Sequence, residues 1–121
     1  MNSLVRNFGF ATAGIQYFFS TERNGRIQAV IALLVIVAGF YFGISNVEWC
    51  LILLCIALVL GVEMMNTALE RVCEMLSADF HPMVKIIKDV AAGAVLCTTI
   101  ASVIVGLLVF LPYIKMLLQN L

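Results

Sequence analysis

Long apolar runs alternate with short polar clusters along the chain, and this pattern predicts three membrane-spanning helices. Two runs are long enough to cross a bilayer, which takes about 20 residues: residues 27–44, interrupted only by Gln28, and residues 90–112, which contain no charge. A third uncharged run, residues 49–62, nearly spans when it continues as a helix through Met65. We therefore expect spans at about 27–44, 48–77 and 88–112. The second of these is long enough to project into the cytoplasm.

Residues 4–20 precede the first span and carry apolar side chains at spacings of three and four. This spacing is typical of an amphipathic helix, and its aromatic residues suit the boundary between lipid headgroups and hydrocarbon. The predicted fold is therefore an all-α membrane protein, one domain over residues 1–121, with a surface helix and three transmembrane helices. No signal peptide is expected, because the first 26 residues lack a compact apolar segment with a cleavage site.

Composition and charge agree with a membrane location. Hydrophobic residues make up 64% of the chain and charged residues 12%, against usual values of about 45–50% and 25%. The formal net charge is zero, so no electrostatic feature favours a nucleic acid partner. Six of the seven Lys and Arg residues lie before the first span, in the cytoplasmic extension of the second, or up to the first residue of the third; only Lys115 lies beyond the third. This distribution predicts a cytoplasmic N-terminus and a C-terminus on the outer side.

Glu63 is the most informative residue, because it ends the apolar run of the second span. A carboxylate in apolar surroundings is costly or takes up a proton, so an ionisable residue in a span indicates a functional site. Asn66, Thr67, Glu70 and Glu74 follow at helical spacing and share its face. The second span therefore carries a polar stripe in its cytoplasmic half.

Charged residues of the neighbouring segments are expected at the same depth. Glu22 and Arg23 lie in the polar corner before the first span, and Lys88 with Asp89 opens the third. Carboxylate oxygens without a His or Cys cluster suit Mg²⁺, and a lysine suits a phosphate. A deeper acid such as Glu63 is placed to take a proton from a hydroxyl dissolved in the bilayer. These parts are typical of phosphoryl transfer, although the chain has no phosphate-binding loop and no soluble-kinase motif.

The motif at residues 63–70 (EMMNTALE), followed by residues 88–95 (KDVAAGAV), resembles the prokaryotic diacylglycerol kinase and undecaprenol kinase family. Residues 21–24 (TERN) add to the resemblance, which covers about residues 4–112. It implies a homotrimeric kinase of the bacterial cytoplasmic (inner) membrane that phosphorylates a lipid alcohol with ATP and Mg²⁺. The substrate is then undecaprenol or diacylglycerol, and the TERN corner and residues 106–112 favour undecaprenol.

The resemblance also implies a role for individual residues. Glu63 is the expected general base, and Glu22 and Glu70 are the expected ligands of Mg²⁺. The residues expected to contact ATP are Glu22, Asn66, Glu70, Asp79, Phe80, His81, Lys88 and Asp89. The residues expected to contact the lipid substrate are Glu63, Asn24, Arg26, Trp49 and Ala92.

The chain departs from the family pattern in its surface helix and in its first span. Ser3 and Phe10 stand where a basic residue and a tyrosine are expected, and Arg6 is the candidate replacement for the basic contact. Gln28 stands where relatives can carry an acid or a histidine, so we assign it no role beyond polarity.

Other interpretations of these residues stay open at this point. Glu63 could be a neutral structural residue, Arg71 and Glu74 are expected to be solvated surface, His81 an exposed loop residue, and Trp49 an interface anchor. A small proton-coupled transporter and a non-enzymatic membrane subunit are the alternative functions. Because three helices alone cannot exclude water from a site, we expect Glu63 and Glu22 of one site to come from different protomers.

Overall fold

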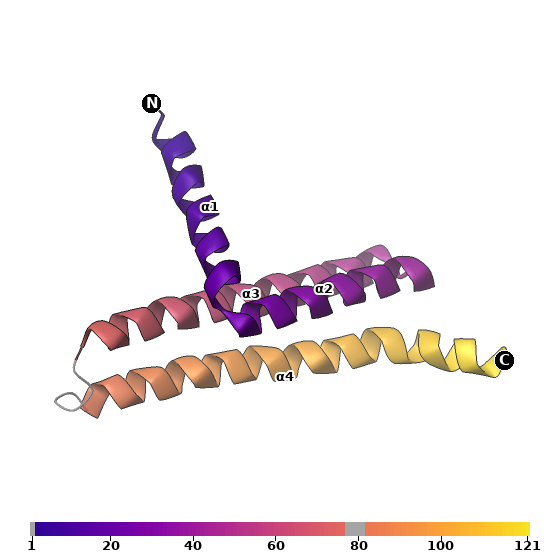
Figure 1. The fold of residues 1–121 in the computed structure, drawn as a ribbon. Coiled ribbons are helices and arrows are strands. Elements are labelled where there is room, and N and C mark those ends of the chain that lie inside the picture. The colour runs from indigo at the N-terminus through magenta and orange to yellow at the C-terminus, as the bar shows by residue number, and fades with distance from the viewer. Residues whose placement is uncertain (1, 77–81) are drawn as a thin grey trace.

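The computed structural model describes residues 2–76 and 82–121, and all secondary structure in these two ranges is helical. Four helices follow one another along the chain (Figure 1): α1 (Ser3–Thr21), α2 (Arg23–Phe42), α3 (Asn46–Met75) and α4 (Pro82–Gln119). By length and composition, α2, α3 and α4 can each cross a membrane. The prediction of an all-helical protein with three membrane spans is confirmed.

Each predicted span lies within or close to the bounds of one helix, and the helices extend beyond the spans at several ends. Helix α2 begins at Arg23 instead of residue 27, because the polar corner is reduced to one extended residue, Glu22. Helix α4 begins at Pro82, where a missing N–H costs nothing in a first turn. It continues through Pro112 to Gln119, since one lost hydrogen bond does not end a helix whose flanking residues are apolar.

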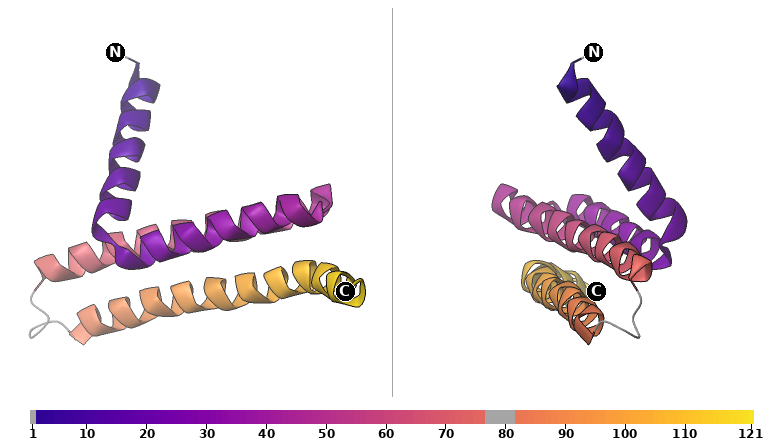
Figure 2. Two further views of the ribbon diagram at one scale, coloured as in Figure 1. Left: turned by 45° about the vertical axis from the view of Figure 1, so that its right-hand side comes forward. Right: turned by 90° about the vertical axis from the view of Figure 1, so that its left-hand side faces the viewer.

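Helix α3 is the central element of the bundle. Helix α4 runs beside it over much of its length, and α2 packs against it on another side (Figure 2). Helix α1 leaves the bundle, so that the N-terminus lies far from the other three helices in every view (Figures 1 and 2). Of the residues in α1, Phe18 alone is buried. That α1 lies on a membrane surface stays a prediction.

The turn between α2 and α3 joins the helices at the end of the bundle away from Glu63. Gly43 ends α2 in the left-handed conformation, with φ 62°, which favours glycine. Ser45 and Glu48 form a capping box at the start of α3. The Tyr113 hydroxyl of α4 donates to Glu48 Oε1 at 2.5 Å, so this carboxylate ties α3 to α4. Ile52 is part of the buried apolar core beside this turn.

The corner between α1 and α2 is held by the contact of Phe18 with Gly25. A Cβ atom on Gly25 would lie 2.5 Å from Phe18 Cε2, so only a glycine lets the ring pack this closely. Arg26 holds the same corner, since its Nη1 donates to the carbonyl oxygens of Phe19 (2.9 Å) and Ser20 (3.2 Å). These contacts fix the direction in which Glu22, the residue between the helices, faces α3.

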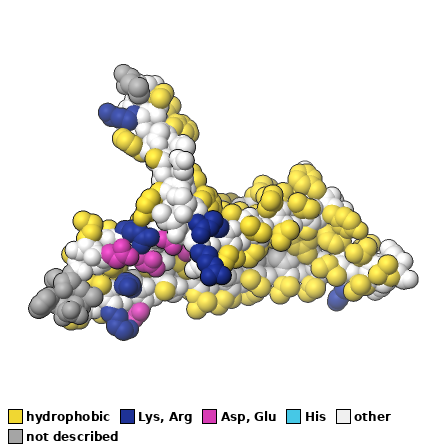
Figure 3. Space-filling model, in the orientation of Figure 1, with side chains coloured by type: hydrophobic (Ala, Val, Ile, Leu, Met, Phe, Trp, Pro, Cys, Tyr) yellow, Lys and Arg dark blue, Asp and Glu magenta, His cyan; other side chains and the backbone are white. Residues whose placement is uncertain are grey.

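The surface of the bundle is mostly apolar, whereas its charges are concentrated. Figure 3 shows hydrophobic side chains over most of the visible face, with acidic and basic side chains gathered where α1 joins the bundle and on the adjacent part of it. Large exposed apolar residues occur on α2, α3 and α4 alike. Lipid is the solvent that makes such a surface favourable.

Candidate active site

Three carboxylates come together where the corner between α1 and α2 meets α3. Glu63 is buried in α3, with 8% of its surface exposed. Glu70 follows about two helical turns later on the same face. Glu22 reaches α3 from the corner, and its ion pair with Arg71 (2.6 Å) places it beside Glu70 in the chain. The acidic part of the predicted polar cluster, Glu22 with the stripe on α3, is therefore found at one place in the chain.

Each of these carboxylates is held at one oxygen by a nitrogen of another side chain. Gln28 Nε2 donates to Glu63 Oε1 (2.9 Å), Asn66 Nδ2 to Glu70 Oε1 (3.0 Å), and Arg71 Nη2 to Glu22 Oε1 (2.6 Å). Within residues 2–76 and 82–121, no side-chain hydrogen bond engages the second oxygen, Oε2, of any of the three. The arrangement thus fixes each carboxylate and leaves one oxygen for a ligand.

Arg71 lies at the surface, as the sequence suggested, but its contacts with α1 and with Glu22 were not predicted. Its guanidinium, 37% exposed, donates to Tyr17 Oη in α1 (3.0 Å), to Glu74 (3.1 Å) and to Glu22 (2.6 Å). One side chain therefore fastens α1 and the corner to α3. Glu74 is largely exposed, with 63% of its side chain accessible, as expected. The contacts of Arg71 were not predicted, because the direction of α1 cannot be read from its own periodicity.

We expect Arg71→Met to lower turnover about three- to tenfold, because Glu22 would lose the partner that holds it among the described residues, and partly exposed ion pairs contribute up to about 1 kcal/mol. Arg71→Lys keeps the charge but not the forked pair of N–H donors, so its rate should lie between those of the wild type and Arg71→Met. The measurement is steady-state lipid phosphorylation in mixed micelles. A rate for Arg71→Met equal to that of the wild type would show that Glu22 needs no clamp.

The structure does not bring Lys88 and Asp89 to the carboxylates. Asp89 accepts from Lys85 Nζ at 2.6 Å on the surface of α4, where these two side chains are 64% and 81% exposed, and Lys88 is exposed as well. Their contact with ATP therefore stays a prediction. The predicted nucleotide contacts at Asp79, Phe80 and His81 lie outside the described residues.

The residues predicted to contact the lipid occupy different parts of the chain. Asn24 and Ala92 are exposed, whereas Arg26 binds the carbonyl oxygens at the end of α1. Trp49 packs against Gly39, whose Cβ, if present, would lie 2.6 Å from the indole ring. On α3 this is roughly 21 Å from Glu63 at 1.5 Å per residue. Trp49 therefore does not belong to the carboxylate cluster, although a contact with a long lipid chain stays a prediction.

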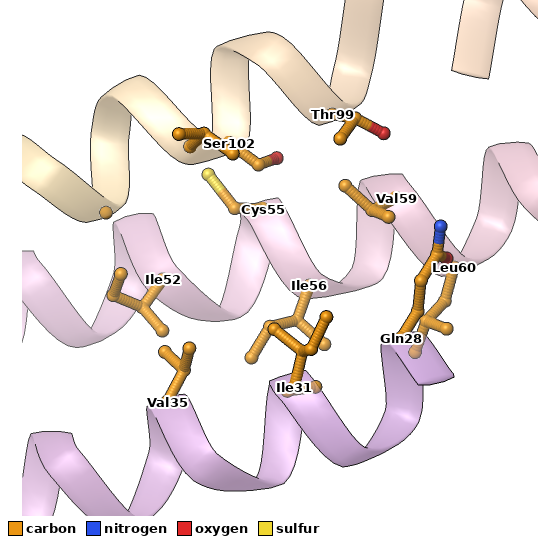
Figure 4. A pocket seen from close by; sticks show the side chains of 13 residues that line it. Gln28, Ile31, Val35, Ile52, Cys55, Ile56, Val59, Leu60, Thr99 and Ser102 are labelled. Atoms are coloured by element: carbon orange, nitrogen blue, oxygen red, sulfur yellow. The ribbon is translucent and has the colours of Figure 1, made fainter. Parts of the chain in front are cut away.

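An apolar cavity of about 270 Å³ lies between α2, α3 and α4. Ile31 and Val35 line it from α2, Ile56 from α3, and Ser102 from α4 (Figure 4). Gln28, the residue that bonds Glu63, stands at one end of it (Figure 4). Glu63 does not line the cavity itself, and its link to this apolar space is the hydrogen bond from Gln28.

The similarity of this chain to one protein family and to three known proteins bears on what such a site does. The family model described as prokaryotic diacylglycerol kinase matches residues 9–110. The chain is 38% identical to an undecaprenol kinase of Bacillus subtilis over 112 residues, which cover 93% of this chain and 91% of that protein. It is 40% identical to a diacylglycerol kinase of Synechocystis over 111 residues, 91% of this chain and 63% of that protein's length. A diacylglycerol kinase of Escherichia coli is 26% identical over 101 residues, 84% of this chain and 83% of that protein.

The chain belongs to the prokaryotic diacylglycerol kinase family. It is a bacterial membrane protein and a lipid kinase, as the resemblance implied. Family membership removes the transporter and the non-enzymatic subunit as alternatives.

This member of the family carries donor groups that fit a magnesium ion. Glu22 and Glu70 each present a carboxylate oxygen, the ligand type that Mg²⁺ prefers, and Mg²⁺ completes its shell with water and substrate phosphates. No group of three or more His, Cys, Asp or Glu residues suited to a metal occurs in the part of the chain that the structure describes. Proteins nevertheless commonly bind Mg²⁺ through one or two carboxylates, and substrate phosphates and water supply the other ligands.

The structure describes a single chain, so the expectation that Glu22 and Glu63 of one site come from different protomers stays a prediction. The break between α1 and α2 turns Glu22 back onto α3 of its own chain, where it meets Arg71. The sequence alone predicted Glu22 and Glu63 on opposite sides of the first span, because it does not show in which direction the corner between α1 and α2 turns. The packing of Phe18 on Gly25 decides that direction.

Sequence reasoning missed two residues of this site, Arg71 and Gln28. Gln28 had a signal, since it is the one polar residue that interrupts the first apolar run. A lone amide in a span must find a hydrogen-bond partner, and the buried acid of the next span was the available one. Arg71 had no comparable signal, because its partners Tyr17 and Glu22 depend on how α1 folds back.

Proposed function

We propose that this lipid kinase transfers the γ-phosphoryl group of ATP to the hydroxyl of a membrane polyprenol, with Glu63 as general base and with Mg²⁺. The buried carboxylate of Glu63 carries the proposal, because its hydrogen-bond partner Gln28 lines an apolar cavity that offers space for a hydrocarbon chain. Diacylglycerol is the alternative acceptor. The family supports a lipid kinase, and the following residues support the finer steps.

Glu63 is suited to activate an alcohol. Its Oε1 is held by Gln28, which leaves Oε2 for the substrate hydroxyl. In the proposed step, the O–H bond breaks as the proton passes to Glu63 Oε2. The alcohol oxygen forms a bond to the γ-phosphorus, and the bond from that phosphorus to the bridging oxygen breaks to release ADP. A positioned base contributes about 10²–10⁴-fold to such a reaction.

Glu22 and Glu70 are suited to hold Mg²⁺ against the nucleotide phosphates. When bound, this ion neutralises the charge that builds up on the phosphates. Arg71 and Asn66 keep the two carboxylates in place, since each donates to one carboxylate oxygen. We assign the remaining nucleotide contacts to Asp79, Phe80, His81, Lys88 and Asp89.

A polyprenol is favoured over diacylglycerol by the extent of the similarity. The undecaprenol kinase of Bacillus subtilis matches over 91% of its length, whereas the diacylglycerol kinase of Synechocystis matches over 63% of its length. The sequence identities to these two proteins, 38% and 40%, do not distinguish an undecaprenol kinase from a diacylglycerol kinase. A cavity lined almost entirely by apolar side chains also suits an isoprenoid, which has no ester groups near its hydroxyl.

We further propose a homotrimer in the cytoplasmic membrane, with the N-terminus in the cytoplasm and the C-terminus outside. The large apolar surfaces of α2 and α4 support an assembly. The position of all Lys and Arg residues except Lys115 supports the orientation. In this orientation α1 lies along the inner membrane surface and the carboxylates face the cytoplasmic ATP pool.

The two acceptors are distinguished by measuring ATP turnover on undecaprenol and on diacylglycerol in the same mixed micelles. We expect kcat/KM to be at least about tenfold higher for undecaprenol, which corresponds to 1.4 kcal/mol of transition-state stabilisation. An equal or higher value for diacylglycerol would overturn the choice of substrate while leaving a lipid kinase.

A further inference from the structure

The carboxamide of Gln28 is only half satisfied, and this is unusual for a buried group. Its Nε2 donates to Glu63 Oε1 at 2.9 Å across the gap between α2 and α3. Its Oε1 is buried and has no hydrogen-bond partner among the residues that the structure describes. Most buried side-chain polar atoms in proteins have a partner, so the unpaired oxygen calls for an explanation.

A purely structural role does not explain this amide well. An unsatisfied buried acceptor costs about 1–3 kcal/mol, and an apolar residue of the same size would avoid that cost. The orientation of the amide matches Glu63, because the NH₂ group donates to a carboxylate oxygen, which accepts. The unpaired carbonyl oxygen is the consequence of turning the NH₂ group toward this one carboxylate.

The position of Gln28 makes the bond consequential for the reaction. Gln28 belongs to α2 and Glu63 to α3, so their bond fixes a long side chain of one helix from the other. Gln28 also lines the end of the apolar cavity, where the alcohol head of a substrate would enter (Figure 4). With Oε1 held, the remaining oxygen of Glu63 keeps one position relative to that end of the cavity.

We propose that Gln28 is a positioning residue, which holds Glu63 so that its free oxygen meets the hydroxyl of the lipid alcohol. The inference rests on the proposed function of Glu63 as the base. Gln28 then affects the rate of the reaction step and not the affinity for lipid, because its amide nitrogen contacts the carboxylate and not the hydrocarbon chain. A misplacement of about 1 Å at a reacting group can lower a rate about 10²-fold.

Gln28→Met tests the proposal, because methionine is unbranched, similar in length and apolar, and so removes the hydrogen bond with little change of volume. We expect kcat to fall about 10- to 100-fold, while KM for the lipid and for ATP stays within threefold. The matched control is Thr98→Val, which removes a hydroxyl whose hydrogen bonds, among the described residues, all go to carbonyl oxygens of its own helix. The control should keep kcat within twofold. An unchanged kcat for Gln28→Met, or a loss carried by KM, would refute the proposal.

A double-mutant cycle separates positioning of Glu63 from a general loss of packing. In Glu63→Asp the carboxylate is one methylene short and does not reach Gln28, so adding Gln28→Met should lower kcat by less than a further twofold. An equal fold-loss in both backgrounds would mean that Gln28 acts independently of Glu63. If Gln28→Met does not assemble, Gln28→Asn replaces it, since the shorter amide keeps the polarity but not the reach.

The outcome also distinguishes this inference from the function on which it rests. If Glu63→Gln keeps its turnover, then the role of the base is wrong and the effect of Gln28 has another origin. If Glu63→Gln is inactive while Gln28→Met turns over like the wild type, only the positioning role fails.

Discussion

Glu63→Gln should remove lipid phosphorylation while the protein still folds and assembles. The substitution keeps the size of the side chain, and the new carbonyl oxygen still accepts from Gln28 Nε2, but no oxygen remains that can take a proton. The expected loss is about 10²–10⁴-fold in kcat, the usual contribution of a general base. It is measured as ATP-dependent phosphorylation of undecaprenol in mixed micelles, with the oligomer checked by gel filtration.

The matched control for this substitution is Glu74→Gln. Glu74 lies on the same helix, and its side chain is 63% exposed and paired only with Arg71 among the described residues. Removing the charge of Glu74 should change the rate of lipid phosphorylation by less than threefold, because exposed ion pairs contribute at most about 1 kcal/mol. Turnover of Glu63→Gln within threefold of the wild type would rule out Glu63 as the base. Failure of that variant to assemble would instead assign Glu63 to the structure.

Glu70→Ala should raise the Mg²⁺ concentration needed for half-maximal turnover by at least about tenfold, in addition to lowering the maximal rate. The reason is the loss of one of two carboxylate ligands, after which the ion depends on Glu22, the nucleotide and water. Titrating Mg²⁺ at saturating ATP measures the shift. Glu74→Ala, about one helical turn further on, is the control and should leave the Mg²⁺ requirement unchanged.

Glu22→Ala should give the same shift, but it also releases Arg71. The two effects separate when Glu22→Ala is compared with Arg71→Met, which removes the ion pair and keeps the carboxylate. A metal ligand is indicated if the Mg²⁺ requirement rises in Glu22→Ala and not in Arg71→Met. The same Mg²⁺ dependence in Glu22→Ala, Glu70→Ala and the wild type would place the ion elsewhere.

Much of the fold could be predicted because lipid imposes a simple rule on the sequence. A chain in a bilayer must form its hydrogen bonds internally and present apolar side chains, so spans are visible as apolar runs. The rule locates helix ends less well, since it does not separate an apolar residue inside a span from one beyond it. Helix α4 therefore continued past Pro112 without a signal in the pattern.

The carboxylate stripe was also predictable, because spacing along one helix depends only on local geometry. Glu63, Asn66 and Glu70 share a face of α3 wherever that helix packs. Residues from other helices did not follow in this way. Lys88 and Asp89 were expected beside the stripe from their depth alone, but the rotation of α4 exposes both of them.

The amino-acid sequence by itself determined the helices, the spans, the stripe with its buried acid, and the motif that places the chain among lipid kinases. These features depend on contacts between near neighbours in the chain or on the contrast between lipid and water. Only the tertiary structure decided that Glu22 returns to α3 of its own chain, that Arg71 holds it there, and that Gln28 binds Glu63. Such pairs join residues far apart in the chain, and the packing of Phe18 on Gly25 and of α2 on α3 brings them within hydrogen-bond distance.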